Sequence, residues 1–269
     1  MTASASGAAQ ASGRPQLTVL IPAYNEERRL EGSLERIASY MTERGIAWDL
    51  LVVDDGSTDA TARLAVEFLR GRRGRVLRNA ENRGKGHAVR RGVLEASGRW
   101  VLVTDADLSA PIEEHAKLQA AVRDHDLDVA IGSRGLPDSR VEIRQHFVRE
   151  RMGKAFNRVV RLMTGLPFRD TQCGFKLLDR DRCLPLFERM VVDRFAFDVE
   201  FLYLCLRFSL RVKEVPVVWR NAPGSTVTLL ADPLNMLLDV TRVRWRFRRG
   251  LYNPSEGGTD QRAGRGEAQ

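Results

Sequence analysis

The stretch WVLVTDAD, residues 100–107, decides how the rest of the sequence is interpreted. An apolar run rich in β-branched residues leads directly into the polar triplet Asp105-Ala106-Asp107. A short apolar run that ends in polar residues is typical of a strand buried within a sheet. In open parallel α/β sheets, ligands bind beyond the carboxyl ends of the strands. The triplet is therefore placed where such a sheet would bind its ligand.

Short β-branched runs alternate with amphipathic segments on both sides of this strand. Five runs of this kind, predicted as strands, lie at residues 17–21, 50–53, 75–77, 100–104 and 128–132. Between the first two, apolar residues recur at helical spacing, at Leu30, Leu34, Ile37 and Met41. Such alternation is typical of β-α-β units around a buried parallel sheet. We therefore predict a Rossmann-like α/β fold with a mostly parallel central sheet flanked by helices.

The second half of the chain is less regular. A basic helix is predicted over about residues 146–164, closing at Gly165 and Pro167. A strand and two helices follow, and the segment 195–208 is expected in the core because it is apolar nearly all round. Residues 211–219 are predicted to form a further strand. In residues 242–249, RVRWRFRR, basic and apolar residues alternate with a period of two, which fits a helix poorly but suits a membrane interface.

Length and composition limit the classes of protein. The 269 residues, 43% of them hydrophobic, suit one large α/β domain or two small ones. The net charge of +8 indicates anionic partners, which include nucleic acid, phosphorylated substrates and lipid surfaces. Three cysteines without Cys-x-x-Cys spacing favour neither a disulfide framework nor a zinc site, which fits a reducing cytosol.

Both ends of the sequence differ in composition from its middle. Residues 1–14 are mostly Ala, Ser, Gly and Thr and are predicted to form a disordered tail, not a signal peptide. Residues 253–269 are rich in Gly, Ser and charge and are also predicted to be disordered. No apolar run approaches the roughly 18 residues of a membrane-spanning helix, so a soluble or peripheral protein is expected.

Polar residues also end the first two predicted strands. The first strand runs into PAYNE, residues 22–26, and the second into DDGSTD, residues 54–59. With Asp105 and Asp107, these clusters should meet at one edge of the sheet. Two carboxylates two positions apart in extended chain point to the same side and suit Mg²⁺ or Mn²⁺. The alternative is that Asp105 caps a helix beginning near Pro111 and Asp107 is solvated; the companion clusters favour the metal site.

Two other loops have both a structural and a functional interpretation. In residues 54–59, Ser57 or Thr58 is suited to cap the following helix, and a carboxylate is suited to accept a hydrogen bond from a uracil or guanine base. In residues 82–87, NRGKGH, two glycines allow close backbone approach, and the start of a helix offers N–H groups to an anion. A loop entering a helix needs no ligand, so contact of Lys85 with a diphosphate is one of two interpretations.

Taken in order, these motifs resemble those of inverting family-two glycosyltransferases with the GT-A fold. The matching segments are IPAYNE (21–26), VDDGSTD (53–59), NRGKG (82–86) and TDAD (104–107). Three later segments look most like dolichyl-phosphate β-glucosyltransferases and their bacterial polyprenyl-phosphate relatives: DTQCGFK (170–176), FDVE (197–200) and Trp219 through Gly224-Ser225. The resemblance spans residues 17–252.

The resemblance implies a single GT-A domain over residues 15–252. Residues 15–133 would form its nucleotide-sugar-binding half, and residues 134–252 the half that faces the acceptor and the membrane. The family's C-terminal region is helical and lies at the membrane, so C-terminal amphipathic interfacial helices are expected. The implied location is the cytoplasm, peripherally associated with the cytoplasmic face of a membrane.

The reaction implied is metal-dependent transfer of a hexose, glucose from UDP-glucose, to a polyprenyl or dolichyl phosphate. The implied partners are a nucleotide sugar, a polyprenyl phosphate lipid and an anionic membrane surface. One alternative uses GDP-mannose, and another a soluble hydroxyl acceptor. A nucleic-acid-binding protein leaves the acidic strand ends unexplained, because carboxylates repel phosphate unless a metal intervenes, so no nucleic acid is expected.

The resemblance also assigns roles to individual residues. Asp105 and Asp107 would hold the metal, Mg²⁺ or Mn²⁺, and Asp107 and Asp170 would be catalytic. Relatives that transfer mannose have a metal-contacting Gln at the position of Ser109, whose hydroxyl is a weaker ligand. The residues expected to bind the nucleotide sugar are Pro22, Ala23, Tyr24, Glu26, Asp54, Asp55, Lys85, Asp105, Ala106 and Asp107.

The acceptor side is expected to need cations more than a strong base. A phosphate monoester with a second pKa of about 6 is mostly ionised at neutral pH. Asp170 is therefore expected to orient the acceptor or stabilise charge on the sugar ring; the alternative is a plain turn residue. Arginine binds phosphate oxygens in pairs. The arginines expected at the acceptor phosphate are Arg134, Arg149, Arg151, Arg242 and Arg244, with Arg140 and Arg144 nearby in sequence.

The basic helix predicted over residues 146–164 has two interpretations. Its apolar stripe consists of Val148, Met152, Phe156, Val159, Val160 and Met163. A basic amphipathic helix is suited to lie on an anionic membrane. The same stripe is equally suited to pack against the sheet.

Overall fold

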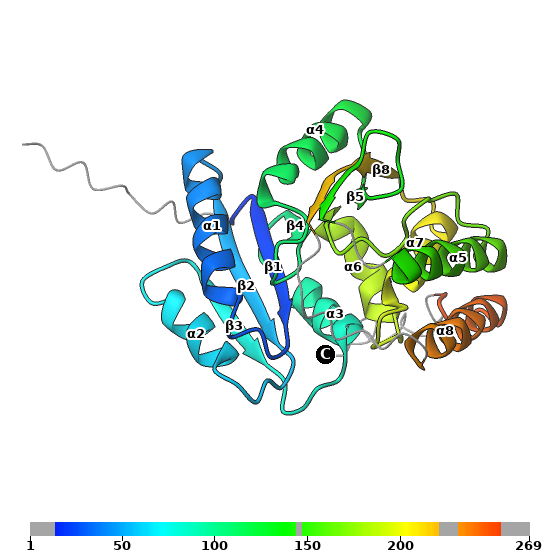
Figure 1. The fold of residues 1–269 in the computed structure, drawn as a ribbon, viewed down its shortest axis with the longest axis horizontal. Coiled ribbons are helices and arrows are strands. Elements are labelled where there is room, and N and C mark those ends of the chain that lie inside the picture. The colour runs from blue at the N-terminus through cyan, green and yellow to red at the C-terminus, as the bar shows by residue number, and fades with distance from the viewer. Residues whose placement is uncertain (1–13, 144–146, 221–230, 254–269) are drawn as a thin grey trace, which may run out of the picture.

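The computed structural model describes residues 14–143, 147–220 and 231–253 of the chain, and its centre is a seven-stranded sheet (Figure 1). The strands lie in the order β3-β2-β1-β4-β7-β5-β8. All neighbouring strands are parallel except at β7, which is antiparallel to both β4 and β5. The predicted mostly parallel α/β sheet and its five N-terminal strands are confirmed. The strands are β1 (Leu17–Ala23), β2 (Trp48–Asp54), β3 (Gly74–Arg78), β4 (Trp100–Val103), β5 (Val129–Ser133), β7 (Lys176–Asp179) and β8 (Val212–Pro216).

Helices cover both faces of this sheet, as Figure 1 shows. Successive side chains of a strand point to opposite faces. In β1, Val19 and Ile21 belong to the apolar cluster that includes α1 (Leu30–Glu43), α2 (Thr61–Phe68) and α4 (His115–His125). Leu20 of the same strand belongs to the cluster on the other face. That cluster includes α3 (Lys85–Glu95), α6 (Arg180–Arg189) and α7 (Phe197–Arg207).

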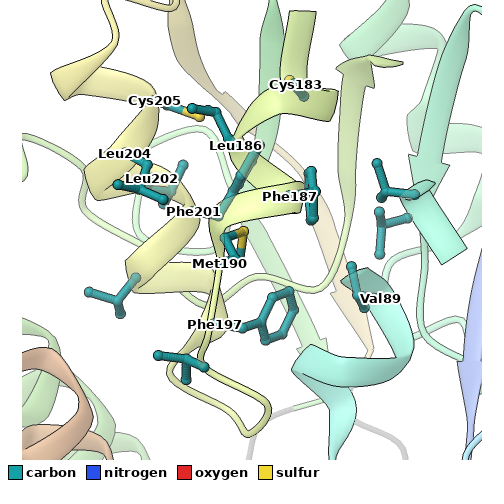
Figure 2. Packing of buried hydrophobic residues seen from close by; sticks show 14 of the residues in the cluster. Val89, Cys183, Leu186, Phe187, Met190, Phe197, Phe201, Leu202, Leu204 and Cys205 are labelled. Atoms are coloured by element: carbon teal, nitrogen blue, oxygen red, sulfur yellow. The ribbon is translucent and has the colours of Figure 1, made fainter. Parts of the chain in front are cut away.

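The core around α7 confirms the prediction for residues 195–208. Every residue from Phe197 to Cys205 is buried, including Asp198 and Glu200. The rings of Phe187 in α6 and Phe201 in α7 lie with centroids 4.9 Å apart. Figure 2 shows both rings in one cluster with Val89 of α3. A helix that is apolar nearly all round is stable only in such a setting.

The two remaining long helices, α5 (Phe147–Thr164) and α8 (Ala231–Arg248), lie against each other at the far end from α2 (Figure 1). Val160 of α5 is buried in the core, whereas Leu162 is 86% exposed. Part of the apolar stripe of α5 therefore packs against the protein, and the side chains of Val148, Met152 and Phe156 lie outside the described part. The helix ends as predicted, with Gly165 at a φ of 73°. Within the described ranges, no helix combines the length and apolarity of a membrane span.

The strands of the second half depart from the prediction. The expected strand over residues 211–219 is divided into β8, which ends at Pro216, and β9 (Val218–Arg220). Proline has no N–H with which to continue the ladder, so the chain leaves the main sheet there. β9 pairs instead with β6 (Arg140–Ile143), a strand that the sequence does not predict.

The alternation of basic and apolar residues in residues 242–249 does not predict the local structure correctly. The segment is helical and belongs to α8 as far as Arg248, so the helix implied by the family resemblance is confirmed and the local pattern is wrong. Its buried side chains, Met236, Val240 and Val243, are spaced by four and three residues. The intervening arginines hide this helical spacing.

Both ends of the described chain are tied to the core. Tyr252, just after α8, is fully buried, and its hydroxyl donates to Glu200 Oε1 at 2.6 Å. Arg14, placed by the sequence in the N-terminal tail, bonds to the carbonyl oxygens of Ser97 and Gly98 and pairs with Asp181 at 3.0 Å. The rest of the tail predicted over residues 1–14, and residues 254–269, lie outside the described residues. The division into two halves at residue 133 stays a prediction.

Tyr252→Phe should lower the free energy of unfolding by about 1.5–3 kcal/mol, because Glu200 loses a hydrogen bond in a buried site. Urea denaturation followed by circular dichroism measures this difference. Tyr24→Phe is the matched control, since the Tyr24 side chain is 37% exposed and should change stability little. Equal stability of the Tyr252 variant and the wild type would show that the contact does not hold α8.

Candidate functional site

The reversed strand β7 brings the second half of the chain to the edge where the parallel strands end. Lys176, its first residue, is in register with Val103, the last residue of β4, and with Ile131 of β5. Residues 170–175 therefore lie beside the loops that follow β4 and β5. The contact is close, because a Cβ atom on Gly174 would come within 2.2 Å of Asp105 Oδ2.

The loops after β1 and β2 join this edge, as the sequence predicts. Asn25 N donates to Ser57 Oγ at 2.9 Å, and Asp55 N donates to Ala23 O at 2.8 Å. Ser57 is thus used to connect two loops and does not cap α2. The first turn of α2 is held instead by Asp59, whose Oδ1 accepts from Thr61 N at 2.9 Å. The capping role expected for Ser57 or Thr58 is wrong.

The Asp105-Ala106-Asp107 triplet forms a turn, and its prediction as extended chain is wrong. β4 ends at Val103, and Leu108 N donates to Asp105 O at 3.1 Å, with Leu108 at a φ of 46°. The alternative role of Asp105 as a helix cap is not found either. The short helix at Ile112–Glu114 follows Pro111 and has no side-chain cap.

The two carboxylates of the triplet have different partners. Asp105 Oδ1 lies 2.5 Å from Lys85 Nζ at the start of α3. Burial alone would raise the pKa of Asp105, but the nearby Lys85 ammonium outweighs it and holds that pKa below its usual range. Asp107 Oδ1 accepts from Ser109 N at 2.9 Å, and its Oδ2 lies 3.8 Å from Arg29 Nη1.

The donor set of the triplet fits a divalent metal that arrives with a phosphate ligand. In the described ranges, no group of three or more His, Cys, Asp or Glu side chains is arranged around a metal position. The side-chain ligands that the triplet could give to a metal are thus limited to the two carboxylates of Asp105 and Asp107. Mg²⁺ is usually held by one or two carboxylates together with waters and substrate phosphates, and Mn²⁺ favours the same oxygen ligands. Ser109 holds Asp107 through its backbone N–H.

Asp54 and Asp55 are buried and already bound by protein donors. Asp55 accepts from Asn79 Nδ2 at 2.6 Å and from Gly84 N at 2.7 Å, which fixes the loop before α3. Asp54 accepts from Ser57 N at 3.1 Å and pairs with the guanidinium of Arg78, also at 3.1 Å. These contacts explain Asp55 structurally, whereas the buried Oδ2 of Asp54 is near Arg78 but has no hydrogen-bond partner within the described residues. Their contact with a nucleotide base stays a prediction.

The first loop lies next to the triplet. Glu26 pairs with Arg29 at 2.6 Å, and Arg29 in turn approaches Asp107. Burial raises the pKa of Glu26, and the carboxylates of Asp107 and Asp105 add to this shift. Tyr24 is partly exposed, whereas Ala23 and Ala106 are buried and Pro22 is half-buried. Their role in a nucleotide pocket stays a prediction.

The acceptor-side residue Asp170 is held by Arg134, which follows β5. The guanidinium makes two bonds to the carboxylate, at 2.7 Å from Nε and 2.9 Å from Nη2, and Arg134 N adds a third at 3.0 Å. Arg134 also lies over the ring of Trp219, 4.7 Å from its centroid. Burial would raise the pKa of Asp170, but the Arg134 guanidinium outweighs it and lowers that pKa. Asp170 is therefore an ionised carboxylate and a weak base.

The other predicted acceptor arginines are not gathered around this pair. Arg242 lies on α8, where it pairs with Asp239 at 3.3 Å and is mostly exposed. Arg244 lies half-buried on the same helix. Arg149 and Arg151 belong to α5, but their side chains lie outside the described part, as do Arg144 and the Gly224-Ser225 segment. Arg140 belongs to β6.

Several residues of this edge received no role from the sequence. Glu214 of β8 accepts from the backbone N–H groups of Arg169 and Asp170, both at 2.8 Å. Lys176 pairs with Asp198 of α7 at 2.6 Å, and both side chains are buried. Glu214, Lys176 and Asp198 each lie beside apolar residues in a strand or helix. Because charged residues are rarely fully buried unless they are paired, this pattern could have indicated buried ion pairs or hydrogen bonds.

A cavity of about 620 Å³ lies at the opposite edge of the sheet. It is lined by residues at the amino ends of β1, β4 and β5, among them Leu17, Trp100 and Asp128. This cavity does not contain the acidic triplet or Asp170. The acidic triplet and Asp170 lie instead near the carboxyl ends of the parallel strands, where open α/β sheets bind ligands, so that edge is the candidate site.

A mostly parallel α/β sheet with a two-carboxylate turn at its carboxyl edge is the architecture of a GT-A glycosyltransferase. The sequence model of the family described as "Glycosyl transferase family 2" matches residues 18–192. The chain belongs to this family of glycosyltransferases.

Curated relatives match most of the chain. A dolichyl-phosphate beta-glucosyltransferase of Drosophila melanogaster is 36% identical over 250 residues, covering 88% of this chain and 77% of the relative. The enzyme of the same name from Homo sapiens is 32% identical over 250 residues, with the same coverage.

Solved structures share the fold at lower identity. Mannosyl-3-phosphoglycerate synthase from Rubrobacter xylanophilus has a TM-score of 0.65 and 18% identity, covering 91% of this chain and 79% of that one. Glucosyl-3-phosphoglycerate synthase from Mycobacterium tuberculosis, in complex with Mn²⁺ and UDP-glucose, has a TM-score of 0.60 and 21% identity, covering 90% and 81%.

Arg134→Met should destabilise the protein at pH 7 by about 3 kcal/mol, because it leaves the buried Asp170 carboxylate without its cation. Arg134 lowers the pKa of Asp170, so its stabilising effect is complete above the usual aspartate pKa of about 3.9. That effect is lost as pH falls through the lowered pKa of the folded state. In the variant, burial raises the pKa of Asp170, so protonation relieves the penalty.

Urea denaturation at pH 7 and at pH 4 measures this difference. The difference in the free energy of unfolding between wild type and variant should be smaller at pH 4 than at pH 7. Arg123→Met removes an exposed arginine paired with Asp124 and serves as the control. A difference in unfolding free energy that does not change with pH would contradict an ionic role for the Arg134–Asp170 pair.

Proposed function

We propose that this chain is an inverting, metal-dependent glucosyltransferase that moves glucose from UDP-glucose to a polyprenyl or dolichyl phosphate. The observation that carries the proposal is the contact between Gly174 and Asp105, which joins the acidic triplet to the loop that holds Asp170. The names of the curated relatives support the acceptor and the sugar. The Mn²⁺ and UDP-glucose in a structural neighbour support the donor and the metal.

The donor side consists of Asp105, Asp107 and Lys85. The two carboxylates would hold Mg²⁺ or Mn²⁺, which when bound offsets charge on the leaving diphosphate. Lys85 lies against Asp105 with its side chain 24% exposed, so a diphosphate at this edge would find a cation beside it. Tyr24, Glu26, Asp54 and Asp55 lie in the adjoining loops and are proposed to line the nucleotide pocket.

The acceptor side consists of Asp170 and Arg134. A lipid phosphate is already ionised and needs orientation and not deprotonation. Arg134 donates two side-chain N–H groups to Asp170, and its other N–H groups could bind the acceptor phosphate. Its position over Trp219 fixes the plane of the guanidinium. The ionised Asp170 carboxylate is suited to stabilise positive charge that develops on the sugar ring during in-line displacement.

The surface formed by α5 and α8 is proposed to lie on the cytoplasmic face of an anionic membrane. Large apolar side chains are exposed there: Leu162 is 86% exposed, Leu238 51% and Trp245 54%. Arginines lie between them on α8, and Arg249 stacks on Trp245 at 5.4 Å. Aromatic rings beside long basic side chains suit the headgroup region of a bilayer.

The reaction is tested by incubating the purified protein with Mn²⁺, UDP-glucose and a short polyprenyl phosphate in detergent. A glucolipid should form, and UDP should be released in equal amount. GDP-mannose replaces UDP-glucose in a second arm, and 3-phosphoglycerate replaces the lipid in a third. Transfer to the soluble acceptor with none to lipid would overturn the proposal.

Asp107→Asn should reduce transfer by at least a hundredfold while the protein stays folded, because one of two carboxylates for the metal is lost. Initial rates of glucolipid formation measure the effect. Asp124→Asn is the matched control, because Asp124 is an exposed aspartate at the end of α4. Full activity of the Asp107 variant would remove the triplet from the mechanism.

The membrane surface is tested by sedimentation with vesicles of phosphatidylcholine and phosphatidylserine. Replacing Arg244, Arg246 and Arg248 by Ala should weaken binding about a hundredfold, since each basic residue near the surface contributes about 1 kcal/mol. Replacing Arg63, Arg70 and Arg72 near α2 removes the same charge from the far end of the molecule and is the control (Figure 1). Equal losses in both variants would show that net charge alone drives binding.

A further inference from the structure

The buried ion pair between Lys176 and Asp198 lies directly behind the contact that joins the two sides of the site. Lys176 Nζ is 2.6 Å from Asp198 Oδ1, and the two side chains are only 4% and 5% exposed. The proposed reaction gives neither residue a role. Burying two charges is costly unless each has partners, so such a pair calls for an explanation.

Lys176 ties the acceptor loop to α7. Its ammonium donates to Cys173 O as well as pairing with Asp198. Cys173 is followed by Gly174, the residue that touches Asp105. Lys176 is also the first residue of β7 and is in register with Val103, so its backbone is fixed by the sheet. The loop carbonyl is therefore held by a side chain anchored at both ends.

The pair also belongs to a larger set of alternating charges. Lys85 lies against Asp105 and is attracted by Asp198 as well. Asp105 is attracted by Lys176 in addition to Lys85. Two ammonium groups and two carboxylates, from α3, β7, α7 and the turn after β4, thus balance one another at this point.

An apolar pair of the same volume would fill this space without directing the loop. Hydrophobic contact has no preferred direction, whereas an ammonium has three N–H donors with defined geometry. Replacement of buried ion pairs by apolar residues is often neutral for stability, so stability does not explain the pair. Its distinctive contribution is the position of Cys173 O and hence of Gly174.

We propose that Lys176 and Asp198 are positioning residues that fix residues 170–175, so that Gly174 stays against Asp105 while Asp170 stays opposite Arg134. The pair then sets the distance between the donor side and the acceptor side. The identity of the reaction rests on the proposed function, whereas the position of the loop does not.

The double variant Lys176→Met with Asp198→Leu tests this role, because it removes both charges together and leaves no buried ion unpaired. It should fold with a thermal midpoint close to that of the wild type. Hydrogen exchange of residues 170–175, followed by mass spectrometry, should become at least tenfold faster. Exchange in β1 and β2, away from the loop, should stay unchanged.

Kinetics give the second readout. The kcat of the double variant should fall at least tenfold with the KM for the nucleotide sugar within threefold, because misplacement of about 1 Å costs as much as a hundredfold in rate. Lys176→Arg keeps a cation with several donors and should retain more kcat than the double variant. Arg182→Met, which removes a partner of buried Asp128 at the opposite edge, is the matched control and should leave both constants unchanged.

A double variant that folds and exchanges like the wild type in residues 170–175 would overturn the proposal, as would an unchanged kcat. If the double variant does not fold, Gly174→Ala tests whether the position of the loop matters, since its Cβ must displace Asp105 or the loop. That variant should lose kcat at least tenfold, and full activity would overturn the proposal. Because hydrogen exchange needs no substrate, failure of this role is distinguishable from failure of the proposed reaction.

Discussion

The antiparallel placement of β7 between β4 and β5 is the constraint on which the site depends. A parallel strand at that position would deliver residues 170–175 to the amino edge of the sheet, away from the acidic triplet. Because β7 is reversed, the chain before it lies beside the ends of β4 and β5. Asp105 and Asp170 are 65 positions apart in sequence, yet Asp170 belongs to the loop of residues 170–175 and Asp105 contacts Gly174 of that loop. Strand direction thus joins the two halves of the chain in one site.

Three of the carboxylates at this edge are held by a donor from another element. Asp105 has Lys85, Asp170 has Arg134, and Asp55 has the backbone at the start of α3. Buried carboxylates without such partners would take up protons. For Asp105 and Asp170 the partner outweighs burial and lowers the pKa. Asp105 and Asp170 are therefore held as negative charges at this edge, and neither is a strong base.

The sequence sufficed for the parallel strands, the helices between them and the polar edge, because hydrophobic periodicity reports burial directly. It did not suffice for contacts between residues that are far apart in sequence or for the conformation of individual turns. The turn at Asp105 depends on Leu108 adopting a positive φ, which a β-branched run ending in polar residues does not reveal. The two bonds between Arg134 and Asp170 depend on β7 being reversed. In α8, the arginines concealed a helical apolar spacing that tertiary packing uses.

We propose that a metal on the acidic triplet and an acceptor beside Arg134 occupy one continuous site. A crystal of the protein with Mn²⁺, UDP-glucose and a short polyprenyl phosphonate tests it most directly through the anomalous signal of manganese. A manganese peak is expected at the carboxylates of Asp105 and Asp107, with the phosphonate beside Arg134. A peak at any other position, or a phosphonate bound away from the loop of residues 170–175, would contradict it.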